Sequence, residues 1–132
     1  MCLRIRKDIT QRLIEKEKGK FKVYKFVHKK DNELYSIFYD YKWKLGENYP
    51  DDGYHFPIFK SFGTVQNTGF HVFLTKEDAL KSKDTVYFID CATLVELEAD
   101  INDLFWAGYW ENTESAVFSK LNLIGEVDMS IH

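Results

Sequence analysis

Cysteine and proline are both scarce in this chain of 132 residues, which contains two of each. Two cysteines, Cys2 and Cys91, are too few for the disulfide framework of a small secreted protein. With two prolines and only seven glycines, the composition also differs from that of a disordered chain. The length fits a single domain, residues 1–132, whose hydrophobic core needs no disulfide or metal for support.

Long hydrophobic runs and targeting segments are missing as well. The opening residues, Met-Cys-Leu-Arg-Ile-Arg-Lys, lack the apolar stretch of a signal peptide. No apolar run approaches the roughly 20 residues that a membrane-spanning helix needs. We therefore expect a soluble protein of the reduced cytoplasm that has no contact with a membrane.

The motifs of common metal and cofactor sites do not occur. The sequence has no CxxC, HxxxH or HExxH, no phosphate-binding glycine loop and no nucleophile elbow. The acidic residues Asp100, Asp103, Glu111 and Glu114 lack the regular spacing of a calcium loop. We therefore expect neither a metal nor a cofactor.

What the sequence has instead is an uneven distribution of charge. Residues 1–30 carry eleven Lys and Arg and three acidic residues, whereas residues 31–132 carry seven and eighteen. If basic and acidic elements lie side by side in the fold, they neutralise each other. Alternatively, residues 1–30 could bind nucleic acid, or the acidic part could bind a basic protein. The net charge of −3 makes nucleic-acid binding the less favoured of these alternatives.

Aromatic residues are abundant, with eleven Phe, eight Tyr and three Trp, and many stand in the alternating pattern of strands. The patterns predict strands at 21–28, 34–43, 69–74, 85–91, 93–98 and 115–127. They predict short helices at 8–18 and 75–83, and packed loops at 54–66 and around 100–112. For the first helix, Ile5, Ile9, Leu13 and Ile14 form the expected apolar face. This order of elements predicts an α+β fold dominated by antiparallel sheet.

The segment from Asn67 to Leu80 is the most organised part of the sequence. It predicts a turn at Gly69, a buried strand, and a helix that Thr75 caps. His71 lies in the middle of this strand, and a histidine can transfer protons near neutral pH. With Tyr35 or Glu126 assisting, it is a candidate catalytic residue; a histidine held in the core by a backbone carbonyl is the alternative.

Aromatic and basic residues alternate along the predicted hairpin of residues 21–43. Tyr35, Ser36, Tyr41 and Lys42, together with His71, are candidate ligand-binding residues, because aromatic rings stack on bases and lysines bind phosphate. A half-buried amphipathic sheet with lysines that extend to solvent produces the same pattern.

A second group of aromatic residues lies around Gly108. Phe105, Trp106, Tyr109 and Trp110 are candidate partner-binding residues, since exposed aromatic side chains often anchor protein interfaces. The alternative is a loop that seals one end of the sheet.

Several short stretches resemble small uncharacterised domains that are common in phage and bacterial genomes. These stretches are Val23-Tyr-Lys, Leu34-Tyr-Ser, Gly46-Glu, the Gly-Phe-His strand and helix of Gly69 to Ala79, and Lys120 to Glu126. The resemblance covers residues 20–127 and implies an α+β fold and a mobile-element origin, without an established activity. The stretch from Gly69 to Ala79 is also similar, more weakly, to ADP-ribosyltransferase folds. That resemblance implies a His or Arg within the first strand, whereas His28 stands at the end of it.

Two hypotheses of different kinds follow. The favoured one is a non-enzymatic, phage-encoded binding protein that blocks or sequesters a component of a host defence system, with a protein or a small nucleotide as its partner. The alternative is a small ADP-ribosyltransferase-like enzyme that acts on a nucleotide through His71. Association of the chain with copies of itself is compatible with both.

Overall fold

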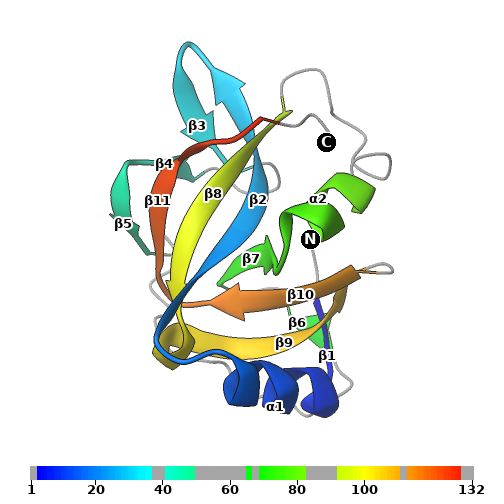
Figure 1. Ribbon diagram of the computed structural model, residues 1–132. Helices are drawn as coiled ribbons and strands as arrows, with labels where there is room; N and C mark the ends of the chain where they lie inside the picture. The colour runs from blue at the N-terminus through cyan, green and yellow to red at the C-terminus, as the bar shows by residue number, and fades with distance from the viewer. Residues whose placement is uncertain are drawn as a thin grey trace.

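A computed structural model describes residues 3–36, 41–49, 65–66, 69–82, 92–110 and 113–128. These residues form an antiparallel sheet of eleven strands with two short helices packed against it (Figure 1). The predicted α+β class is therefore confirmed. Neither helix of the described part of the chain is long and apolar enough to cross a membrane.

The described residues contain two helices and eleven strands. In order they are β1 (Leu3–Ile5), α1 (Lys7–Lys16), β2 (Lys20–Lys30), β3 (Glu33–Tyr35), β4 (Lys42–Trp43), β5 (Gly46–Asn48), β6 (Val65–Gln66), β7 (Phe70–Phe73), α2 (Lys76–Lys81), β8 (Ala92–Asp100), β9 (Leu104–Trp110), β10 (Thr113–Phe118) and β11 (Leu121–Glu126). A 3-10 turn, Ile101–Asp103, joins β8 to β9.

The sheet has two parts that meet at one position. One part has the order β5-β11-β8-β2, and the other has the order β7-β10-β9-β1-β6. They are joined where β2 pairs with β7, and the paired residues there are Tyr24 and Phe73. Figure 1 shows the strands of the two parts crossing at a steep angle. The sheet therefore folds over on itself, and each part covers the other.

The first part curls further through β3 and β4. A tight turn at Asp31 and Asn32, both with positive φ, joins β2 to β3, as the predicted hairpin requires. β3 pairs with β4, and Lys44 and Leu45 connect β4 directly to β5, which pairs with β11. The strands β2, β3, β4, β5, β11 and β8 thus follow one another in a ring.

Asn48 holds the turn between β4 and β5. Its side chain is buried, and its Oδ1 accepts hydrogen bonds from the Tyr41 hydroxyl at 2.9 Å and from the Lys44 amide at 3.1 Å. Its Nδ2 donates to the carbonyl oxygens of Lys44 and Gly46, at 2.8 and 2.9 Å. β4 pairs with β3 and not with β5, so backbone groups in the β4–β5 turn need other hydrogen-bond partners. The Asn48 side chain supplies these partners.

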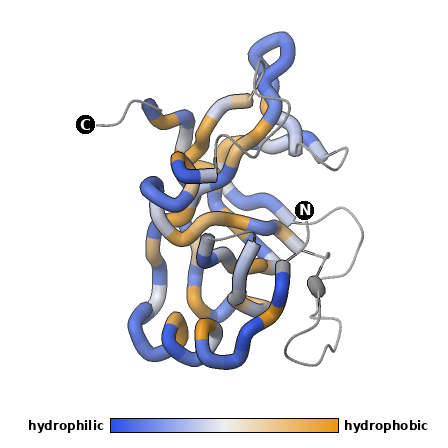
Figure 2. Tube along the Cα trace, turned by 90° about the vertical axis from the view of Figure 1, so that its right-hand side faces the viewer, coloured by the Kyte–Doolittle hydropathy of each residue, from blue (hydrophilic) through white to orange (hydrophobic). Residues whose placement is uncertain are grey.

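The main core lies between the two parts of the sheet. Figure 2 shows hydrophobic segments along the strands and hydrophilic ones along the β2–β3 hairpin. The members of this core include Val23, Val27, Trp43, Phe70, Val72, Val95, Leu97, Ala116, Phe118, Leu121 and Leu123. A second, smaller core of Phe26, Phe73, Ala79 and Leu94 lies under α2.

Helix α1 packs on β9 through Ile9 and Leu13. One detail of the prediction for this helix is wrong. Ile14 is 43% exposed, because it lies outside the narrow face that contacts the sheet. The residue at the helix cap, Arg6, makes no side-chain capping bond, and Asp8 lies in the first turn, where a negative charge is favourable.

Helix α2 follows the prediction closely. The hydroxyl oxygen of Thr75 accepts a hydrogen bond from the amide of Asp78 at 3.0 Å, which caps the helix. Ala79, within the helix, is fully buried. Gly69 precedes β7 with a φ of +80°, and a Cβ there would lie 2.6 Å from Cγ1 of Val117. Only glycine fits this turn.

The later strands differ from the prediction. The segment around 100–112 is not a loop, because residues 104–110 form β9. The predicted strand at 115–127 is two strands, β10 and β11, separated by a turn at Ser119 and Lys120. The predicted strand at 85–91 lies outside the described residues, as does most of the predicted loop at 54–66, of which residues 65–66 form β6.

Candidate functional site

Basic and acidic strands lie side by side, which explains the uneven charge of the sequence. β2, which contains five lysines, pairs from Lys20 to His28 with the acidic β8. Ion pairs join Lys20 to Glu98 at 3.8 Å, Lys22 to Glu96 at 3.7 Å and Lys29 to Glu126 at 3.1 Å; Arg12 of α1 pairs with Glu114. Much of the positive charge of residues 1–30 is therefore compensated within the fold.

The predicted catalytic residues make their contacts in different places. His71 is 3% exposed within β7, where it stands opposite Val117 of β10. The Tyr35 hydroxyl donates a hydrogen bond to Glu33 at 2.7 Å, and Glu126 accepts from Lys29 at 3.1 Å and from Thr93 at 3.2 Å. No described hydrogen bond links Tyr35 or Glu126 to His71. Catalysis by His71 stays a prediction.

The predicted ligand-binding residues divide into two groups on the hairpin. Tyr35 and Lys42 stand opposite each other on β3 and β4, and both bind the carboxylate of Glu33, at 2.7 Å each. Glu33 raises the pKa of both the Tyr35 hydroxyl and the Lys42 ammonium, because it accepts a hydrogen bond from each. This group is a small surface network.

The second group faces the core. The Trp43 indole donates to the hydroxyl oxygen of Ser36 at 2.9 Å, and the rings of Tyr41 and Trp43 pack against Phe70, with ring centroids 5.2 and 4.5 Å apart. Ser36 and Tyr41 therefore hold the hairpin against β7. Their binding of a ligand stays a prediction.

The predicted partner-binding aromatic residues lie within β9 rather than on a protruding loop. Phe105 is buried against Val117, and the other three are half-buried. Trp110 packs against Phe73, with ring centroids 5.6 Å apart, and the guanidinium of Arg6 lies over the Tyr109 ring at 5.4 Å. These contacts hold the rings within the molecule, and a role for Trp106 or its neighbours in partner binding stays a prediction.

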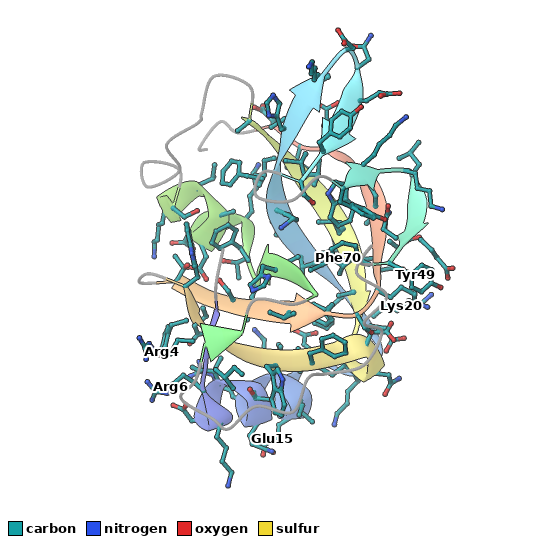
Figure 3. All side chains as sticks on the ribbon, turned by 180° about the vertical axis from the view of Figure 1, so that it is seen from behind. Arg4, Arg6, Glu15, Lys20, Tyr49 and Phe70 are labelled. Atoms are coloured by element: carbon teal, nitrogen blue, oxygen red, sulfur yellow. The ribbon has the colours of Figure 1, made fainter. Side chains whose placement is uncertain are left out.

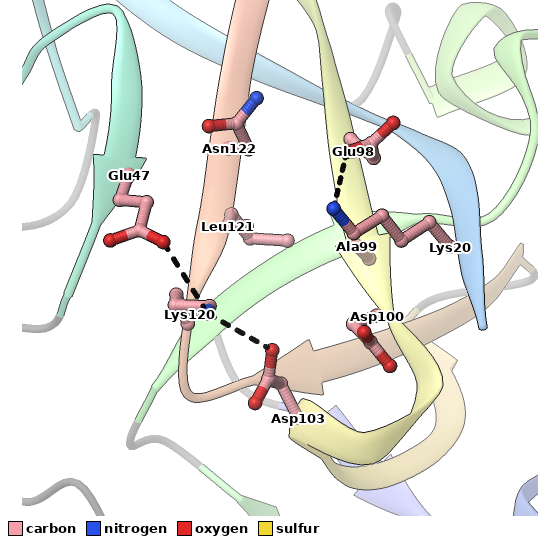
Figure 4. A pocket seen from close by; sticks show the side chains of 9 residues that line it. All are labelled: Lys20, Glu47, Glu98, Ala99, Asp100, Asp103, Lys120, Leu121 and Asn122. Atoms are coloured by element: carbon pink, nitrogen blue, oxygen red, sulfur yellow. Dashed lines mark ion pairs between the residues drawn. The ribbon is translucent and has the colours of Figure 1, made fainter.

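A pocket of about 130 Å³ opens at the end of the first part of the sheet. It lies where β2 begins, β8 ends and the β10–β11 turn meets β5 (Figure 4). The residues that line it are Lys20, Glu47, Glu98, Ala99, Asp100, Asp103, Lys120, Leu121 and Asn122. Two lysines and four acidic residues give this lining a formal charge of −2.

Lys120 is one of the two lysines of this pocket and lies near two of its carboxylates. Its Nζ lies 3.6 Å from Glu47 and 4.0 Å from Asp103 (Figure 4). These two carboxylates raise the pKa of Lys120, so it stays protonated at neutral pH. Burial raises the pKa of Asp103, and the charge of Lys120 partly offsets this effect.

Exposed apolar side chains lie beside the pocket on the same sheet face. Leu45 is 76% exposed, Tyr49 is 44% exposed and Ile124 is 43% exposed. Leu45 and Tyr49 flank β5, and the pairing of Leu123 with Gly46 brings Ile124 next to Leu45. Figure 3 shows Tyr49 and Lys20 on one side of the molecule, away from Arg4 and Arg6.

Neither described helix packs mainly on this face, since α1 lies on β9 and α2 on β2, β7 and β10. We call the surface formed by the pocket and these three apolar side chains the open face. Sequence reasoning missed it, because its residues come from four separate segments of the chain. In the sequence, Asp100 and Asp103 stand out as acidic residues only, and no local pattern connects them to Glu47 or Lys120.

Comparison with protein-family models, with curated proteins and with solved structures gives no significant match. Within the described residues, no group of three or more His, Cys, Asp and Glu side chains is arranged to hold a metal ion.

Proposed function

We propose that this protein is a non-enzymatic binding protein that docks another protein on its open face. The observation that carries the proposal is the position of Leu45, Tyr49 and Ile124, which expose apolar surface beside a charged pocket. An apolar patch bordered by polar groups is typical of protein interaction sites. It supports docking because covering exposed apolar surface with a partner is favourable.

The chemistry of the open face favours a protein over a nucleotide. The acidic excess of the pocket repels phosphate, whereas nucleotide sites supply positive charge or backbone amides. The apolar side chains lie outside the pocket, where a flat protein surface reaches them more readily than a small molecule does.

In its finer form, the proposal makes the partner a component of a host defence system that this protein blocks. The resemblance of the Gly69 to Ala79 stretch to small phage and bacterial domains supports this choice of partner. An inhibitor of this kind needs only a stable scaffold and a complementary surface, without catalytic residues.

Site-specific photo-crosslinking in a bacterial lysate tests the proposal. A photoreactive residue is placed at Ile124, on the open face, and in a control at Ile14, which is equally exposed on α1. We expect a discrete adduct from position 124, absent from position 14 and lost when Leu45→Asp is added. Equal labelling from both positions, or none from 124, would contradict docking on this face.

A further inference from the structure

We infer that the partner presents an arginine or lysine side chain that enters the pocket between Glu47 and Asp103 while its neighbouring apolar residue covers Leu45 and Ile124. This inference rests on the proposed function and names the chemistry of the partner's contact segment. It depends on the charges, the unfilled acceptors and the apolar border of the open face.

Glu47 accepts a hydrogen bond from the Tyr49 hydroxyl at 3.1 Å, and the other carboxylates of the pocket have acceptor capacity to spare. In the described part of the chain, no hydrogen bond reaches the Asp103 carboxylate, whose closest cation is Lys120 at 4.0 Å. Among the described residues, one oxygen of Asp100 is engaged, by the Asn102 amide at 2.9 Å. The only described cation near Glu98 is Lys20, at 3.8 Å. A guanidinium, with five N–H donors, fits such a set of acceptors.

Lys120 shows that this position accommodates a cation. Its ammonium lies between Glu47 and Asp103 at distances longer than a hydrogen bond, and the lining still has an acidic excess. A second cation entering the pocket therefore meets net attraction, and Lys120 competes with it for the same two carboxylates. Removing Lys120 should strengthen binding of a basic segment. A general loss of structure would weaken this binding instead.

The pocket has the size for such a group. A volume of about 130 Å³ holds several water molecules, which matches a guanidinium with part of its stem. The aliphatic stem of an arginine packs well beside apolar side chains. Ile124 lies on β11 and Leu45 directly precedes β5, and these two strands supply Asn122 and Glu47. One partner segment can reach both features.

The first test uses a defined probe in place of the partner. A blocked five-residue peptide that alternates valine and arginine is titrated into the isotope-labelled protein, with the same peptide carrying citrulline as the control. We expect the arginine peptide to shift the amide signals of residues 45–49 and 120–124. The citrulline peptide should bind about tenfold more weakly. Equal shifts with both peptides would overturn the inference.

The second test uses variants with opposite expected effects. Glu47→Gln with Asp103→Asn should weaken binding of the arginine peptide by roughly tenfold, and Lys120→Gln should strengthen it several-fold. Glu15→Gln with Glu77→Gln makes the same charge change at exposed helix positions and should leave binding unchanged. Thermal unfolding of each variant separates lost binding from lost folding. Equal changes in the pocket and helix variants would reduce the effect to net charge and overturn the inference.

The two proposals fail in different ways. If a partner crosslinks at position 124 but the pocket variants do not change its affinity, the docking proposal is supported. The inferred contact between a basic side chain and the pocket is then wrong. If the arginine peptide binds as expected but no protein crosslinks at position 124, the pocket chemistry holds and the proposed function is wrong.

Discussion

The side-chain nitrogen of Lys25 donates a hydrogen bond to the carbonyl oxygen of His71, 2.8 Å away, at the place where β2 and β7 separate. β2 and β7 pair only at Tyr24 and Phe73, so the neighbouring carbonyl of β7 has no ladder partner on β2. Lys25 lies on the strand face of Val23 and Val27, two residues of the main core. A lysine therefore completes a backbone interaction that the diverging strands leave open.

The burial of Lys25 predicts that the free energy of unfolding depends on pH in an unusual way. Burial lowers the pKa of Lys25 from 10.5 to about 8, so the folded protein releases this proton at lower pH than the unfolded chain does. Between pH 8 and 10 the unfolded state binds more protons, and the free energy of unfolding should rise with pH. A shift of this size corresponds to at most ~3 kcal/mol.

Urea unfolding at pH 7, 8.5 and 10 measures the effect. Lys25→Met should remove most of the rise, because no group at that position then titrates. Lys22→Met is the matched control on the exposed face of the same strand and should keep the rise. An identical pH profile for the protein and Lys25→Met would show that Lys25 is not the titrating group.

Replacing Gly69 by alanine should destabilise the fold more than replacing Gly19. Both have a positive φ, +80° and +76°, which costs an alanine about 1 kcal/mol. At Gly19 the added Cβ meets nothing within 4 Å, whereas at Gly69 it meets Val117, Phe118 and Phe105. Gly69→Ala should lower the free energy of unfolding by about 3 kcal/mol and Gly19→Ala by about 1 kcal/mol. If both variants lose the same free energy of unfolding in denaturant titrations, the neighbours of Gly69 move to make room for the added Cβ.

The helix cap at Thr75 should be worth about 1 kcal/mol of stability. Thr75→Ala removes the hydroxyl that accepts from the Asp78 amide, while Thr75→Ser keeps it. For a domain of this size we expect the melting temperature to fall by about 3 °C in the alanine variant and by less in the serine variant. If both variants melt alike, the methyl group of Thr75 matters more than its hydroxyl.

Charge on the open face should affect binding without affecting the fold. Ile124→Asp and Leu45→Asp alter exposed side chains, so we expect melting temperatures within about 2 °C of the parent protein. Affinity for a partner crosslinked at the open face should fall at least tenfold, because an aspartate replaces the apolar contact. Ile14→Asp, with the same exposure on α1, should retain full affinity in the same titration.

The sequence predicts the elements that carry a local signal. β7 and α2 combine a glycine turn, an apolar strand and a capping threonine, and the structure confirms all three. β9 carries a weaker signal, because Gly108 and a register shift near Phe105 interrupt its alternation. The two strands β10 and β11 read as one, since their turn at Ser119 and Lys120 contains neither glycine nor proline.

The open face could not be predicted in the same way. Its pocket needs Lys20 at the start of β2, Glu47 on β5, Asp103 after β8 and Lys120 before β11. Only the order of strands in the sheet brings these positions together, and that order depends on contacts between residues distant in the sequence. Mutual neutralisation of basic and acidic elements is one of the alternatives that the sequence offers, and the register of β2 and β8 accounts for it.

The chain passes repeatedly between the two parts of the sheet that meet at Tyr24 and Phe73. β1 belongs to the second part, β2 and β5 to the first, β7 to the second, β8 to the first, β9 and β10 to the second, and β11 to the first again. No cut in the sequence separates one part from the other, so neither can fold as an independent fragment. Proteolysis within residues 83–91 should therefore leave two pieces that remain associated under native conditions and separate only in denaturant.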